Sequence, residues 1–205
     1  MLDGLFPEGV ITAFGDPLAP AKPLFPEEEA LVARAVEKRR LEFAKGRECA
    51  RSALASFGLG DAPLLAGETR EPLWPADVVG SITHTRGLCA AAVARSARYR
   101  GIGIDAEPAE PLDDDLARRV CADEEAALSS SGLERGVVFR LVFSAKEAVY
   151  KCVFPITRRF LGFDDVHVRL TGDAFRAFLR VDSAPFRRGD EFEGRWRRID
   201  EPAGA

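Results

Sequence analysis

Two carboxylates stand two residues apart, directly after a short apolar run. The run covers residues 101–104, and the acids are Asp105 and Glu107. In an extended strand alternate residues point to the same side, so both carboxylates would project together. Adjacent carboxylates repel each other unless a cation lies between them, and hard oxygen ligands of this kind suit Mg²⁺. The alternative is a strand that ends in solvent, because surface acids are common.

A second set of polar residues shares one stripe of a predicted helix. At about 100° per residue, four side chains fall on this narrow stripe: Arg140, Ser144, Glu147 and Lys151. The surrounding residues are mostly apolar, whereas a surface helix usually has a wide polar face. We therefore expect a mostly buried helix with a thin polar ridge. Two simpler interpretations stay open, an intrahelical Glu147–Lys151 salt bridge and a capping box that starts at Ser144.

Two weaker features favour the binding of an anion. His84 lies among hydroxyl residues in the stretch 80–85, and such a histidine can donate hydrogen bonds to a phosphate. Arginine makes paired hydrogen bonds to phosphates, and four arginines gather on or near one side of a predicted helix: Arg39, Arg40, Arg47 and Arg51. A structural histidine and a solvated charged face are the competing interpretations.

Composition narrows the class of protein. The 205 residues are 46% hydrophobic and 30% charged, and the net charge of −4 argues against a general nucleic-acid binder. The four cysteines form no C-x-x-C pair and are expected to be free thiols. No apolar run approaches the roughly 20 residues that span a bilayer, and the N-terminus lacks the features of a secretion signal. We expect a cytoplasmic protein.

The elements that would position these residues alternate between helices and strands. Prolines, glycines and apolar periodicity predict helices over 26–58, with a bend or division at Gly46, and over 113–128 and 133–153, the last closed by Pro155. Short strands are predicted over 78–82, 89–94, 99–106, 166–170, 178–181 and 191–198, whereas 1–25 and 59–77 are irregular. This order predicts an α+β fold of two similar halves, 1–105 and 106–205, each a small antiparallel sheet packed on a long helix.

Taken together, these segments resemble the Sfp-type 4′-phosphopantetheinyl transferases, most closely their actinobacterial and enterobactin-type branch. The likeness runs in order from about residue 26 to 170, and the pair G-I-D-x-E and F-S-x-K-E-x-x-x-K is its most specific part. The matching stretches are 38–43, 46–51, 72–75, 80–85, 101–107, 143–151, 154–155 and 161–163.

The resemblance implies a pseudo-two-fold fold that binds coenzyme A, and a reaction that moves the phosphopantetheine arm to a serine of an acyl-carrier or peptidyl-carrier domain, releasing 3′,5′-ADP. It implies a Mg²⁺ site, which Mn²⁺ could also fill, formed by Asp105, the backbone of Ala106, Glu107 and Glu147. Glu147, directly or through a metal-bound water, is the implied base for the serine.

The resemblance also assigns the groups that hold the nucleotide. The phosphates would be received by Arg39, Arg47 and His84, with Thr83 beside them. Lys151 would neutralise the pyrophosphate, assisted by Lys146. Relatives usually offer a lysine in the loop before the P-x-W-P stretch, where this chain has only Arg70. The chain also ends where relatives continue with a further strand.

The sequence is compatible with two rival functions. One is a non-catalytic module of the same fold that binds coenzyme A or a nucleotide. The other is a different Mg²⁺-dependent phosphoryl-transfer enzyme, but the chain has no G-x-x-x-x-G-K-[ST] loop and no kinase signature. The expected partners are coenzyme A and a carrier domain, with no nucleic acid and no membrane, and the expected state is a monomer. The sequence does not identify the pathway of the carrier.

Overall fold

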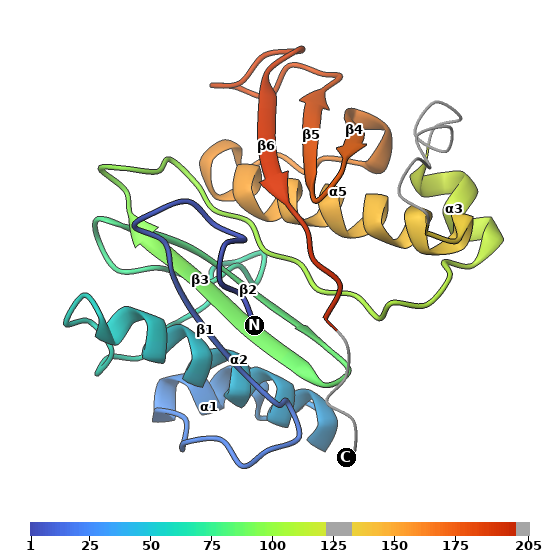
Figure 1. The fold of residues 1–205 in the computed structure, drawn as a ribbon. Coiled ribbons are helices and arrows are strands. Elements are labelled where there is room, and N and C mark those ends of the chain that lie inside the picture. Colours follow the sequence, from blue (N-terminus) through green and yellow to red (C-terminus); the bar gives the residue numbers. More distant parts are fainter. Residues whose placement is uncertain (122–132, 200–205) are drawn as a thin grey trace. The chain divides into compact units, whose positions relative to one another are not determined.

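The computed structural model describes residues 1–121 and 133–199, and the chain divides into two compact units. One unit covers residues 8–106, and the other combines residues 1–7 with the chain from Glu107 onward. Each unit contains a three-stranded antiparallel sheet and a long helix (Figure 1). The predicted α+β class is therefore confirmed. No helix in the described part of the chain has the length and apolar character that a membrane span needs.

The unit of residues 8–106 is built around the helix α2. In chain order its elements are β1 (Ile11–Gly15), α1 (Pro26–Val32), α2 (Glu37–Ala55), β2 (Val78–Thr85) and β3 (Leu88–Arg95). The strands pair antiparallel in the order β1-β3-β2, and α2 lies along one face of this sheet (Figure 1). Small and apolar residues of α2 and β3 form the contact, among them Ala50, Ala53, Cys89 and Val93.

The helical segment that starts at Pro26 is two helices rather than one. Proline at the first helical position and three following glutamates begin α1 as predicted, because both suit the positive end of a helix. α1 ends at Val32, and α2 starts at Glu37. The expected division at Gly46 is wrong, since α2 is continuous there. Gly46 instead allows close packing, because a Cβ atom would lie 3.2 Å from Cγ2 of Ile82 on β2.

Two predictions for strands in this unit are wrong. The irregular segment 1–25 contains β1, which pairs with β3 from Ile11↔Val93 to Gly15↔Cys89. Residues 99–106, in contrast, form no strand. The backbone N–H of Ile104 donates to Oγ of Ser81 (3.2 Å), so a side-chain hydroxyl of β2 takes the place of a ladder carbonyl. The apolar pattern of this segment reflects burial of Ile102 and Ile104.

The other unit is built around the helix α5. Its elements are α3 (Asp114–Val120), α5 (Arg135–Thr157), the 3₁₀ turn η1 (Phe163–Asp165), β4 (Val166–Thr171), β5 (Ala174–Leu179) and β6 (Glu191–Arg195). The strands form a meander in the order β4-β5-β6, covered on one face by α5 (Figure 1). The contact face of α5 consists of Val138, Val142, Ala145, Val149 and Val153.

The boundaries of the helices differ from the prediction in two places. Pro155 does not close α5, which continues to Thr157 and ends at Arg158 in the left-handed conformation (φ 54°). Proline lacks the N–H that would bond four residues back, and in agreement with this loss α5 ends two residues after Pro155. The predicted helix over 113–128 is observed only as α3, and its part from residue 122 lies outside the described residues.

The two sheets share one local topology. In each unit a long helix is followed by an antiparallel hairpin, β2–β3 or β4–β5. The third strand then pairs antiparallel with the second strand of the hairpin. In one unit this third strand, β1, comes before the helix, and in the other, β6, it comes last. The two units therefore have the same local strand pairing, although the third strand comes at a different place in the chain order.

Candidate active site

Arg39 of α2 and His84 of β2 are in contact. Nη1 of Arg39 lies 3.0 Å from Nε2 of His84, and Oε2 of Glu42 lies 3.1 Å from the same nitrogen. Arginine only donates and a carboxylate only accepts, so Nε2 serves one of them at a time, depending on the tautomer. The structure thus joins two residues that the sequence assigned to phosphate binding. Glu42 was missed, although its position three residues after Arg39 on a helix gave a signal.

Arg47 is the buried cation of this helix. Only 5% of its surface is exposed, and its guanidinium lies 4.3 Å from the ring centre of Phe43. Desolvation by burial, opposed by the charge of Glu28, lowers the pKa of Arg47 to about 10, so the side chain is charged at neutral pH. Its Nε is buried without a hydrogen-bond partner among the described residues. The interpretation of a solvated charged face is therefore wrong for Arg47.

Arg51, one turn further along α2, has a structural role. It pairs with Glu28 of α1, with Nη1 2.5 Å from Oε2, and it also donates to the carbonyl of Pro23 (3.4 Å). Glu28 is 0% exposed and accepts two further hydrogen bonds, from the backbone N–H groups of Phe25 (3.0 Å) and Leu64 (2.9 Å). This buried pair ties α1 and two loops to α2.

Asp105 and Ala106 are held by one hydroxyl of β2. Oγ1 of Thr83 donates to Oδ1 of Asp105 (3.3 Å) and accepts from the backbone N–H of Ala106 (3.1 Å). Thr83 is only 2% exposed. Both bonds are compatible with one hydroxyl, which has a single proton and two lone pairs. The structure thus brings Thr83 to the acidic motif.

Glu107 is held by Arg140, a residue of the polar ridge on α5. Nη1 of Arg140 donates to Oε2 of Glu107 (3.1 Å). The other two guanidinium nitrogens approach the carbonyls of Glu110 and Pro111, each at 3.4 Å. One side chain thus fixes the carboxylate and the following four residues against the helix. The sequence placed Arg140 on the ridge but gave it no partner.

The remaining ridge residues follow on the same side of α5. Glu147 and Lys151 are half-buried, two and three turns beyond Arg140. From Gly136 to Thr157 only Pro155 is exposed, which confirms the expectation of a mostly buried helix with a thin polar ridge. The capping-box interpretation at Ser144 is wrong, because α5 begins at Arg135.

Lys146 lies off this ridge and is 4% exposed. Its ammonium donates to the carbonyl of Val120, the last residue of α3 (2.7 Å), and to the carbonyl of Phe163 in η1 (3.0 Å). A cation at a helix C-terminus is favourable because the last carbonyls are unsatisfied there. Lys146 therefore connects α5 to two neighbouring elements.

Arg70 lies in a tight turn of the loop 59–77. Its φ of 69° places it in the left-handed region, and its backbone N–H donates to the carbonyl of Gly67 (3.0 Å). The side chain is exposed. No contact joins it to Arg39 or His84 among those described, and its role in binding stays a prediction.

The chemistry of the acidic residues suits a hard divalent cation. Carboxylates that ligate metals are usually oriented by further hydrogen bonds, and both Asp105 and Glu107 have such a partner. Asp105 and Ala106 belong to one unit, and Glu107 and Glu147 to the other. Within residues 1–121 and 133–199 no group of three or more His, Cys, Asp or Glu side chains is gathered as a metal site. The four-residue metal site therefore stays a prediction.

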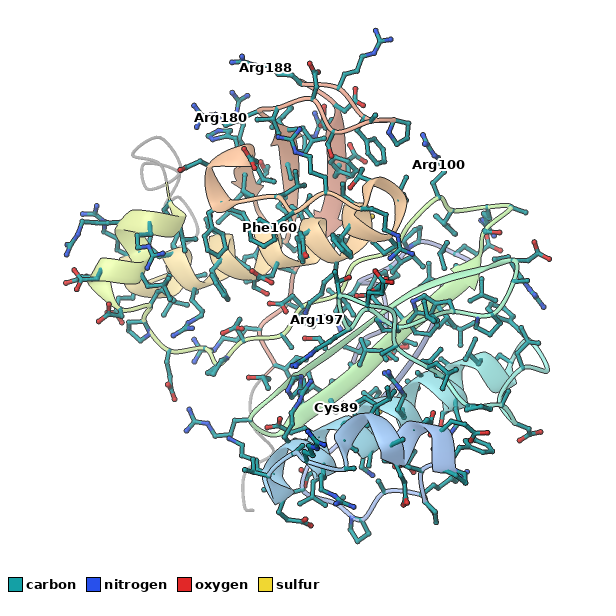
Figure 2. The ribbon with its side chains drawn as sticks, turned by 180° about the vertical axis from the view of Figure 1, so that it is seen from behind. Cys89, Arg100, Phe160, Arg180, Arg188 and Arg197 are labelled. Atoms are coloured by element: carbon teal, nitrogen blue, oxygen red, sulfur yellow. The ribbon has the colours of Figure 1, made fainter. Side chains whose placement is uncertain are left out.

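The cysteines are free thiols, as predicted. Cys89 on β3 (labelled in Figure 2) and Cys49 on α2 are buried where helix and sheet meet. Sγ of Cys49 lies 3.6 Å from the carbonyl of Cys89. The hydrogen bond between the two thiols raises the pKa of Cys89, and burial adds to this. Burial also raises the pKa of Cys152, to about 11. Such thiols are poor nucleophiles at neutral pH.

Known families match both parts of the chain. Residues 27–94 match the N-terminal domain of 4′-phosphopantetheinyl transferases, and residues 101–199 match the 4′-phosphopantetheinyl transferase superfamily. The chain belongs to this superfamily of enzymes. It is a 4′-phosphopantetheinyl transferase, which transfers phosphopantetheine to carrier proteins.

Individual relatives are similar over most of the chain. The 4′-phosphopantetheinyl transferase Svp of Streptomyces mobaraensis is 46% identical over 96% of this chain and 84% of its own length. PptT of Mycobacterium tuberculosis is 41% identical over 78% of this chain and 70% of its own length. Enterobactin synthase component D of Escherichia coli K12 is 36% identical over 60% of this chain and 58% of its own length. The family and branch recognised from the motifs are thereby confirmed.

Proposed function

We propose that the chain transfers the 4′-phosphopantetheine arm of coenzyme A to a serine of an apo acyl-carrier or peptidyl-carrier domain and releases 3′,5′-ADP. In this assignment residues 8–106 hold the nucleotide, and the residues from Glu107 onward supply Glu147 and Lys151. The observation that carries the proposal is Arg47, a buried guanidinium whose Nε has no hydrogen-bond partner in the described part of the chain. A buried cation without such a partner is costly unless a ligand completes it.

The nucleotide phosphates are the anions that complete this cation. Arg39 and His84 already contact each other, and the charge of Arg39 acts on Arg47. A phosphate bound here would accept paired N–H hydrogen bonds from each guanidinium. Such charged donors form stronger hydrogen bonds than neutral ones. Arg70 is assigned to the same nucleotide, in place of the lysine that relatives carry.

The acidic residues are assigned to one divalent cation, Mg²⁺ or Mn²⁺. Asp105, the backbone of Ala106, Glu107 and Glu147 would hold it. Bound there, the cation would neutralise and polarise the pyrophosphate of coenzyme A. The support is the donor chemistry together with the hydrogen bonds that orient Asp105 and Glu107.

The transfer itself exchanges one P–O bond for another. The serine oxygen forms a bond to the phosphorus that carries pantetheine, and the bond to the leaving 3′,5′-ADP breaks. Glu147 accepts the serine proton, and Lys151 balances the negative charge of the pyrophosphate. Lys146 supports this helix from its buried position.

We propose a pseudo-two-fold arrangement of the units, a monomeric state and a cytoplasmic location. We propose no nucleic-acid and no membrane partner, because the net charge is −4 and the basic residues are local. The non-catalytic module is not favoured, since the relatives are named as transferases over most of this chain.

The decisive experiment is incubation with several apo-carrier proteins, coenzyme A and Mg²⁺, followed by mass spectrometry. A gain of about 340 Da on a carrier, the covalent mass of the arm, identifies both reaction and partner. Asp105→Ala should abolish the gain, whereas Asp114→Ala, an exposed acid in the first turn of α3, should not. Coenzyme A binding without any mass gain on any carrier would favour the non-catalytic module, and full activity of Asp105→Ala would refute the metal assignment.

A further inference from the structure

Each carboxylate of the D-x-E motif has a hydrogen bond from a side chain of its own unit that is not a proposed metal ligand. Thr83 bonds Asp105 and Ala106, and Arg140 bonds Glu107. We infer that Thr83 and Arg140 are positioning residues for the divalent cation. The inference rests on the proposed metal site and deepens it.

Thr83 is placed for orientation rather than for contact with the nucleotide. It is 2% exposed, and its only proton is directed to Oδ1 of Asp105. Oγ1 of Thr83 also accepts the N–H of Ala106, so the hydroxyl fixes both the side chain of Asp105 and the backbone of the next residue. A hydroxyl engaged in this way has no proton left for a phosphate.

Arg140 fixes Glu107 through three nitrogens. Its contact with Oε2 sets the direction of the other carboxylate oxygen, and its approaches to the carbonyls of Glu110 and Pro111 hold the following chain in register with α5. The planar guanidinium is suited to this, whereas an ammonium could not satisfy three separated acceptors in one plane. Glu147 lies two turns further along the same stripe of α5. By holding residues 107–111 on α5, Arg140 therefore also sets their position along the helix that carries Glu147.

Variants of Arg140 and Thr83 can separate the effect of hydrogen-bond geometry from the effect of charge. Arg140→Lys keeps the positive charge but loses the fork, so a change in metal affinity reports orientation. Thr83→Val removes the hydroxyl at nearly constant shape, and Thr83→Ser restores it. The matched controls are Arg135→Lys, an exposed arginine of the same helix stacked on Phe139, and Thr85→Val, two residues along β2.

The measurement is a Mn²⁺ titration of the full chain with coenzyme A, followed by the electron paramagnetic resonance signal of the free ion. Outer hydrogen bonds to metal ligands typically change affinity by about 10–100-fold. We expect Arg140→Lys and Thr83→Val to weaken Mn²⁺ binding at least about 10-fold. Thr83→Ser and both controls should bind like the wild type.

A second readout distinguishes orientation from general damage. In the transfer assay the Mg²⁺ concentration for half-maximal rate should rise with the Mn²⁺ dissociation constant, whereas the KM for coenzyme A at saturating Mg²⁺ should stay near the wild-type value. Unchanged Mn²⁺ affinity in both folded variants would overturn the inference and leave the proposed function intact. A wild-type protein that transfers the arm but binds no Mn²⁺ would overturn the metal assignment and this inference with it.

Discussion

The buried carboxylate of Glu28 offers the sharpest test of how α2, the helix proposed to bind the nucleotide, is held. Its two oxygens receive three hydrogen bonds, from Arg51, Phe25 and Leu64, at 2.5, 3.0 and 2.9 Å. In Glu28→Gln one oxygen becomes an NH₂ group. Whichever way the amide turns, at least one N–H donor then faces another donor.

The size of the effect follows from these contacts. A buried donor left without an acceptor costs about 1–3 kcal/mol. Removing one partner of a buried ion pair costs about 3–5 kcal/mol, because the other charge stays buried. Arg51 is also buried, so we expect Glu28→Gln to lower the free energy of unfolding by about 3–5 kcal/mol. Since Glu28 supports the charge of Arg47, the KM for coenzyme A should rise as well.

The assay is urea unfolding followed by circular dichroism, with the m-value as a check that the transition is comparable. The control is Glu8→Gln, which breaks the 3.3 Å pair with Arg98; these two side chains are 90% and 53% exposed. A pair of that kind contributes about 1 kcal/mol or less. In the double variant Glu28→Gln with Arg51→Met, part of the loss should be recovered. A Glu28→Gln protein within about 1 kcal/mol of wild type would refute the reasoning.

Four further predictions concern three side chains. Arg47→Met should raise the KM for coenzyme A by about 10–100-fold, the equivalent of one charged hydrogen-bonding group, whereas Arg40→Met on the exposed side of α2 should not. Because the pKa of Arg47 is about 10, anion binding should be constant from pH 7 to about pH 9 and fall as the cation is lost near pH 10, which calorimetry in that range can check. Lys146→Met should lower the melting temperature and change the KM for coenzyme A little, since its ammonium bonds two carbonyls; the opposite pattern would make it a ligand. Cys152, with a pKa of about 11, should be alkylated slowly at pH 7.5, by mass spectrometry, and faster by up to tenfold per pH unit below that pKa.

The strong periodic signals of the sequence predicted the long elements well. The proline and acidic residues from Pro26 onward predicted the start of α1, and the apolar residues at helical spacing predicted α5. Both signals depend only on residues close together in the chain. β1 was missed although Ile11, Thr12 and Phe14 favour strands, because the prolines and glycines around it indicated an irregular segment and its pairing with β3 is distant in the chain. Such tertiary pairing is not encoded in the strand itself.

The residues that orient the proposed site were harder to predict than those assigned to act in it. Asp105, Glu107 and Glu147 carry charges at informative spacings, and the motifs found them. Arg140 lacked a visible partner because Glu107 lies 33 residues before it. A long-range hydrogen bond of this kind leaves no periodic trace, so only the folded chain reveals it.

The strand β2 shows how one short motif can serve two sites. Alternate residues of a strand point to opposite faces. His84 points to the α2 side, where it meets Arg39, and Ile82 packs there against the core of that helix. Thr83 points to the other side, where it bonds Asp105. Adjacent residues of the stretch 80–85 are therefore divided between the anion-binding side and the acidic segment. A shift of β2 by one residue would exchange these faces, so the register Thr83↔Ala90 and His84↔Cys89 is itself a requirement of the site.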